Sequence, residues 1–211
     1  ARGETDSARE HVRAAFGSDD VPLAEKVDIA WTYIELSEMQ PNLQPEAQQL
    51  VDLLKESDPS AAAPFELQAA LHDMAGNSTA ALEALTEALD RDPNSPDRWL
   101  EACQLCISSQ EWSRLNDMAT SAGGLFPSLP VFPYFRGMAL MEDGDDVGAE
   151  RQLKVARNLI VDRPDFESDV LVMLAQIAHD RGDHGASDGW FDVAIEVNPQ
   201  NVEDCKKEQI T

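Results

Sequence analysis

Three short stretches of this sequence contain the residue types that bind metal ions or carry out redox chemistry. Residues 141–152, MEDGDDVGAERQ, place four carboxylates around Gly144. Cys103 and Cys106 form a C-x-x-C pair, and residues 179–184 are HDRGDH. Carboxylates are calcium ligands, and paired cysteines bind zinc or exchange electrons. Each interpretation depends on whether the remaining ligands and the secondary structure that must hold them are present.

The acidic stretch lacks two ligands of a calcium-binding helix–loop–helix motif. Counted from Asp143, the fifth position is Val147, where an oxygen ligand is needed, and the twelfth is Lys154, where a bidentate glutamate belongs. A turn between two helices is the better prediction, because the glycine would reverse the chain and Asp145 or Asp146 would cap the next helix.

The cysteine and histidine stretches are also incomplete as sites. Zinc needs four ligands, and beyond Cys103 and Cys106 the chain has only Cys205. A redox pair would follow a strand, whereas these cysteines fall inside a predicted helix, where they are expected to be small buried packing residues. His179 and His184 are five residues apart, without the i, i+4 spacing of H-E-x-x-H, and are expected in a solvated turn. We therefore expect no metal, no cofactor and no catalysis.

Composition excludes several classes of partner. The 211 residues include 40 Asp and Glu against 16 Lys and Arg, a net charge of −24, which disfavours binding to nucleic acid and to anionic membranes. No apolar run approaches the roughly 18 residues that span a bilayer, so no membrane insertion is expected. A soluble protein is predicted, cytoplasmic, or periplasmic if an N-terminal signal was removed. The Asp-rich, Lys-poor composition is typical of salt-loving organisms, and the alternative is an ordinary acidic protein with basic partners.

The sequence repeats with a period of 34 residues. Around the repeated positions the apolar spacing is helical: in residues 81–89, Ala81, Leu82, Leu85, Ala88 and Leu89 lie on one helix face. Each unit is therefore predicted to be a helix, a short turn and a second helix. Four series of equivalent positions carry the period: Pro59, Pro93 and Pro127; Trp31, Phe65 and Trp99; Ala69, Cys103 and Gly137; and Gly76, Gln110 and Gly144.

These positions make the chain resemble the tetratricopeptide repeat family. The unit that matches best has Ala175, Gly182, Asp183, Phe191, Ala194 and Pro199 in the family's slots. The resemblance implies an all-α, right-handed α-α superhelix of about five helix-turn-helix repeats, in which stacked units share one core. The expected repeats are residues 28–61, 62–95, 96–129, 130–167 and 168–201.

Both ends of the chain look like partial repeats. Ala8, Val12 and Ala15 have the spacing of a second helix, so residues 1–27 are expected to form a helix, as a partial repeat or cap, and a loop. Residues 202–211 would be a tail or the start of a further helix. Because solenoids usually need polar terminal caps, we expect the chain either to be part of a larger solenoid or to shield its ends by self-association.

The resemblance places a concave groove along the first helices and implies a protein or peptide ligand. Some relatives hold a terminal carboxylate with Lys and Asn, and these positions here are Thr32 and Leu36, Glu66 and Ala70, and Leu100 and Gln104, so that clamp is absent. The remaining groove positions favour a basic or amphipathic segment. The alternative hypothesis is a structural segment of a larger scaffold that associates through its ends. The candidate groove contacts are Leu36, Met39, Glu66, Met74, Leu100, Gln104, Ile107, Tyr134, Met138, Met141 and Gln176.

Overall fold

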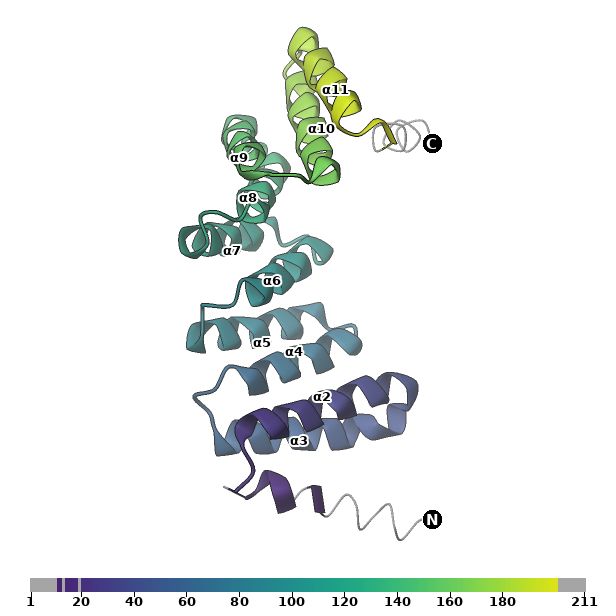
Figure 1. Ribbon diagram of the computed structural model, residues 1–211, viewed down its shortest axis with the longest axis vertical. Helices are drawn as coiled ribbons and strands as arrows, with labels where there is room; N and C mark the ends of the chain where they lie inside the picture. Colours follow the sequence, from purple (N-terminus) through teal and green to yellow (C-terminus); the bar gives the residue numbers. More distant parts are fainter. Residues whose placement is uncertain (1–10, 13, 19, 201–211) are drawn as a thin grey trace. The chain divides into compact units, whose positions relative to one another are not determined.

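The computed structural model describes residues 11–12, 14–18 and 20–200, and in these residues the only regular secondary structure is helical (Figure 1). The predicted tail at 202–211 and Ala8 of the predicted N-terminal helix lie outside the described residues. The chain divides into two compact units, residues 1–109 and residues 110–211. Each unit is described by itself below.

The first unit is a stack of helices in chain order. Its bounds are α2 Leu23–Met39, a 3-10 turn Pro41–Leu43, α3 Gln44–Ser57, α4 Ala63–Met74, α5 Ser78–Arg91 and α6 Pro96–Ser108. Each helix packs against its neighbour in the chain, and α2 also packs against α4. Their shared core contains Ala30, Ile34, Val51, Leu54 and Leu67, together with the buried Phe16 from the start of the chain. Phe16 lies before α2 in the chain and is one of the largest fully buried side chains.

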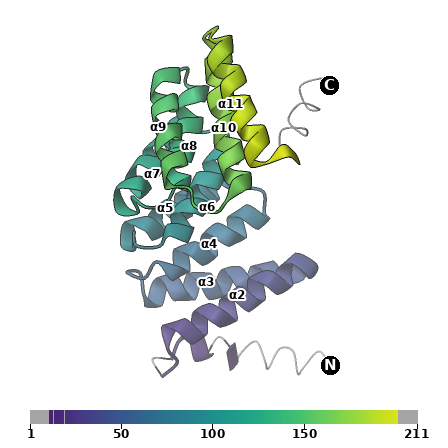
Figure 2. The same ribbon diagram turned by 45° about the horizontal axis from the view of Figure 1, so that its top comes forward.

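In its described residues, 110–200, the second unit contains two further helical hairpins and one leading helix. Its bounds are α7 Trp112–Leu125, α8 Val131–Glu142, α9 Asp146–Leu159, α10 Pro164–Asp180 and α11 His184–Val197. The helices α8 and α9, and α10 and α11, lie side by side (Figure 2). A core of Ala149, Leu153, Ala156, Val170, Leu174 and Ile177 joins α9 to α10.

The first helix of the repeat is longer in two repeats than in the other three. Helices α4, α6 and α8 have 12 or 13 residues, whereas α2 and α10 have 17. The expected repeat start at residue 168 lies inside α10, one turn after Pro164. Pro164 is the first residue of that helix, where its fixed φ is favourable and its missing N–H costs no hydrogen bond.

Three turns between paired helices have the same construction. Gly76, Gly144 and Gly182 have φ values of 70°, 78° and 76°, which glycine adopts without steric cost. The residue after each glycine is the N-cap of the next helix, and its side chain accepts a hydrogen bond from a backbone N–H three residues on: Asn77 from Ala80, Asp145 from Gly148 and Asp183 from Ala186. The acidic stretch around Gly144 is therefore a helix-capping turn.

Gln110 occupies the same turn position without being glycine. Its φ is 57°, a left-handed conformation that costs a residue with a Cβ about 1–2 kcal/mol. We expect Gln110→Gly to raise the free energy of unfolding by about 1 kcal/mol, since the strain exceeds the extra chain entropy of glycine. Urea unfolding followed by circular dichroism measures this change. Gly144→Gln, the reverse substitution at the equivalent turn, should lose a similar amount, and equal effects of the same sign would contradict the explanation.

Candidate protein-binding surfaces

The face formed by α4 and α6 in the first unit is built around one arginine. The side chain of Arg98 is only 10% exposed, and its guanidinium forms an ion pair with Glu66 of α4 and a second one, at 3.5 Å, with Asp92. Its backbone N–H is bonded to the N-cap residue Ser95, which fixes the start of α6. Arg98 therefore holds Glu66 beside the first turn of α6.

Carboxylates outnumber this arginine on the same face. Partial burial of Glu101 raises the pKa of its carboxyl group, and the nearby charges of Glu66 and Asp73 raise it further, while Arg98 lowers it. The positive charge of Arg98 is thus insufficient to neutralise the three acids. Near Glu101, carboxylates therefore outnumber the guanidinium, and an added cation would interact favourably with them.

Glu101→Gln tests this excess of negative charge. Because the folded-state pKa is raised, ionisation of Glu101 destabilises the fold, and stability is lost as pH rises from the unfolded pKa through the folded pKa. We expect the variant to be more stable than the wild type near neutral pH, by less than about 1 kcal/mol because the side chain is solvent-screened. The difference should vanish well below the ordinary value of 4.5, where glutamate is protonated in both states. Urea unfolding of both proteins at neutral and at acidic pH measures this difference in stability. A difference that does not change with pH would contradict the raised pKa of Glu101.

Several of the expected groove contacts in this unit are accessible at the surface. Met39 of α2 is 77% exposed, and Gln104 of α6 is also exposed. Leu36, Leu100 and Ile107 are half-buried, so part of each side chain remains available to a partner. Met74 is half-buried too, but it packs against the core of the first unit. Of the expected contacts in this unit, Met74 is therefore the most engaged in internal packing.

The expected contacts in the second unit differ in how far internal packing already occupies their side chains. Tyr134 makes an edge-on contact with Phe166, with ring centroids 5.0 Å apart, and burial followed by the charge of Asp169 raises the pKa of its phenol. Tyr134 and Met141 both pack against the core between α9 and α10. Met138 is half-buried, and Gln176 donates a hydrogen bond to Asp180 at 2.8 Å. Met138 and Gln176 are the more accessible pair.

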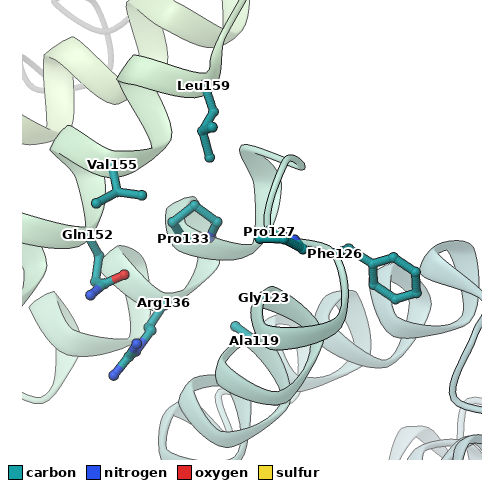
Figure 3. A pocket seen from close by; sticks show the side chains of 9 residues that line it. All are labelled: Ala119, Gly123, Phe126, Pro127, Pro133, Arg136, Gln152, Val155 and Leu159. Atoms are coloured by element: carbon teal, nitrogen blue, oxygen red, sulfur yellow. The ribbon is translucent and has the colours of Figure 1, made fainter.

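The structure also contains pockets that the sequence did not predict, on the side of the second helices. One, of about 640 Å³, lies between α3, α4 and α5, and another, of about 230 Å³, lies between α7, α8 and α9 (Figure 3). Each pocket is lined by a residue that bonds a side chain twenty residues earlier: Gln68 bonds Gln48, and Arg136 bonds Asn116. A polar pair at this spacing was the available sequence signal.

The groups with reactive chemistry are engaged in structure. Cys103 and Cys106 are buried thiols of α6, and burial, followed by the influence of Cys106, raises the pKa of the Cys103 thiol to about 12. At neutral pH this thiol is an unreactive packing group. Among the described residues, no group of three His, Cys, Asp or Glu side chains is placed to hold a metal ion. None of the helices there is both long and apolar enough to cross a membrane.

Comparisons with known proteins identify the fold. No family model matches the sequence, and no curated protein matches it. Solved structures do match. A structure of MamA is 14% identical with a TM-score of 0.68, covering 85% of this chain and 96% of the other. YrrB, described as a TPR protein with an unusual peptide-binding site, is 16% identical with a TM-score of 0.69, covering 94% and 99%. PilF of Pseudomonas aeruginosa is 16% identical with a TM-score of 0.59, covering 85% and 78%.

These likenesses confirm the predicted fold class. The chain is all-α in its described part and has the fold of tetratricopeptide-repeat solenoids. Identities of 13 to 17% establish the fold alone. Function has to be argued from the faces and pockets of this chain itself.

Proposed function

We propose that this chain, which has the tetratricopeptide-repeat fold, is a non-catalytic interaction module that binds a basic, amphipathic protein segment along the first helices α2, α4 and α6. The observation that carries the proposal is that three carboxylates, Glu66, Asp73 and Glu101, lie near the single guanidinium of Arg98 on a face that also carries partly exposed apolar side chains. A peptide-binding site in YrrB, which shares the fold, supports the same class of function.

The chemistry of this face defines the ligand. Lysine or arginine side chains would neutralise the acids that now raise the pKa of Glu101, and such complementarity selects partners more than it adds affinity. Leu36, Leu100 and Ile107 would pack against the apolar side of the segment. Met39, with three rotatable side-chain bonds and little to hold it, suits ligands of different shape.

Within the second unit, the same proposal assigns the main contacts to Met138 and Gln176. Tyr134 and Met141 contribute only the parts of their surfaces that core packing leaves free. A substitution at Tyr134 would disturb the contact with Phe166 as well as any ligand. Leu100 is the better position for a test of binding, because it is half-buried and lies next to Glu101.

The test uses an acetylated Leu/Lys peptide with helical apolar spacing and a Leu/Glu peptide of the same pattern. Calorimetric titration is done with the wild type, with Leu100→Lys, and with the control Leu125→Lys, which changes a 47% exposed leucine of α7. We expect Leu100→Lys to weaken binding of the Leu/Lys peptide at least about tenfold, by repulsion and lost apolar contact. Leu125→Lys should have little effect.

Both variants carry the same change in net charge, so the comparison separates a defined face from general attraction to an acidic protein. Equal weakening by the two variants would mean that the peptide binds through net charge alone, and the proposed face would be wrong. Preference for the Leu/Glu peptide would also overturn it. Circular dichroism of both variants checks that the helices are retained.

A further inference from the structure

The pocket between α7, α8 and α9 has an apolar interior and one polar end. Ala119 and Gly123 of α7 form one wall, and Pro133, Val155 and Leu159 form the opposite side. Gln152 and Arg136 lie together at one end of this space, whereas the ring of Phe126 points away from it (Figure 3). With a volume of about 230 Å³, the pocket can accept one large apolar side chain.

Among the described residues, Arg136 uses only one of its side-chain donors in a hydrogen bond. Its Nε donates a hydrogen bond to Asn116 at 3.3 Å, and no carboxylate of the described residues forms an ion pair with it. By contrast, Arg98, Arg157 and Arg181 pair with carboxylates. A guanidinium with free Nη donors beside an apolar pocket is suited to bidentate binding of a carboxylate.

The neighbouring surface of α9 adds a second cation. Arg151 precedes Gln152 and lies one helical turn from Val155, which is 44% exposed. Arg151 is itself exposed, and no ion pair to a described carboxylate is formed by it. Arg136 is thus the one charged residue among the described residues that line the pocket, with Arg151 on the adjoining surface of α9, on a chain whose net charge is −24. This local sign is opposite to that of the face formed by α4 and α6.

The glycine in the wall is not required by packing. A Cβ on Gly123 would lie 3.7 Å from the Cβ of Phe132, an ordinary contact, and a Cβ on Gly124 would meet nothing within 4 Å. Glycine inside a helix costs about 1 kcal/mol relative to alanine. Absence of a side chain at Gly123 keeps the wall of the pocket open, since a larger residue there would project into it.

We propose that this pocket is a second protein-binding site, which takes a segment in which a large apolar side chain is followed directly by a carboxylate. The apolar side chain enters between Gly123, Pro133 and Val155, and the carboxylate binds Arg136, with Gln152 as an additional donor. The site is separate from the face of α2, α4 and α6 and selects a ligand of opposite charge. A test of this site is therefore independent of a test of the proposed function.

The test is a titration of nitrogen-15-labelled protein followed through amide signals, which detects millimolar binding. Three capped peptides with Gly-Ser flanks carry Leu-Glu, Leu-Gln or Ser-Glu at the centre, in about 0.15 M salt, where the Debye length is about 8 Å and distant acids are screened. We expect Leu-Glu to shift the Gly123 signal saturably. Leu-Gln and Ser-Glu should bind at least about fivefold more weakly, because each lacks one half of the recognised group.

Variants of this chain assign the two halves. Arg136→Gln should abolish the preference for Leu-Glu over Leu-Gln, and Gly123→Leu should abolish binding by filling the pocket. Gly124→Leu, the matched control on the next residue of α7, should leave binding unchanged. Circular dichroism shows whether each variant keeps its helices.

Several outcomes would overturn the proposal. An unmoved Gly123 signal, equal binding of Leu-Glu and Leu-Gln by the wild type, or an unchanged preference in Arg136→Gln would each do so. Tighter binding of 4-methylpentanoate, which has the apolar group and the carboxylate without a peptide backbone, would instead make the pocket a small-molecule site.

Discussion

Gly137→Ala is expected to lower the free energy of unfolding by about 1–3 kcal/mol, although alanine is the better helix former. Gly137 is buried in α8, where α9 crosses it closely. A Cβ added there would lie 2.7 Å and 2.8 Å from the Cγ and Cδ2 atoms of Leu153, distances that force a fully buried leucine to move. Urea unfolding followed by circular dichroism at 222 nm measures the effect.

A second glycine and a second substitution make this result specific. Gly124→Ala in α7, where the new Cβ meets nothing within 4 Å, should stabilise the protein by about 0.5–1 kcal/mol. Leu153→Ala alone should cost about 2–5 kcal/mol. The double variant of Gly137 and Leu153 should cost less than the sum of the single ones, because the small side chain makes room for the new methyl group. Additive costs would show that the two residues are not in conflict.

Trp99→Ala should be the most damaging single change in the first unit, with a loss of about 3–5 kcal/mol. Trp99 is 8% exposed in α6, which packs against α5. Its indole Nε1 donates a hydrogen bond to the carbonyl oxygen of Pro93 at 2.8 Å, which ties the helix to the turn before it. The substitution removes a large apolar volume and leaves that carbonyl without its donor. Chemical unfolding followed by circular dichroism gives the loss.

Trp31 is the matched control, because it occupies the same repeat position in α2 and is 37% exposed. We expect Trp31→Ala to cost less than half of the Trp99→Ala loss. Trp99→Phe, which keeps most of the packing and loses the hydrogen bond, should cost about 1–2 kcal/mol. Equal losses of unfolding free energy in Trp31→Ala and Trp99→Ala would contradict the explanation, because the two side chains differ in burial.

The paired helices and their turns were predictable because their determinants are local. A glycine followed by Asn or Asp, as at Gly76, Gly144 and Gly182, combines a left-handed residue with a helix cap, so a few adjacent residues are sufficient. Small residues at a fixed period, such as Cys103 and Gly137, indicated close helix packing, and both are buried. Such signals locate elements and parts of the core without any knowledge of distant contacts.

The accessibility of the candidate contacts could not be predicted in the same way. Tyr134 appeared as a groove residue by its repeat position, yet its ring contacts Phe166, which belongs to the additional first turn of α10. A repeat begun at residue 168 leaves that turn out, so this neighbour could not be foreseen. The pocket beside Arg136 was missed for a related reason. Its walls come from three helices, and whether a space remains between them depends on the size of side chains that are far apart in the sequence.

Packing between neighbours in the chain has a consequence for synthesis on the ribosome. The core that joins α2, α3 and α4 draws on residues up to Met74, and α5 and α6, which bring their own buried residues, pack against helices that precede them. Contacts of such short sequence separation form quickly. Translation at about 5–20 residues per second takes seconds to add the second unit. We therefore expect the first unit to begin folding on the ribosome before the second unit has been synthesised. This order would shorten the time for which its apolar helix faces are exposed in the nascent chain.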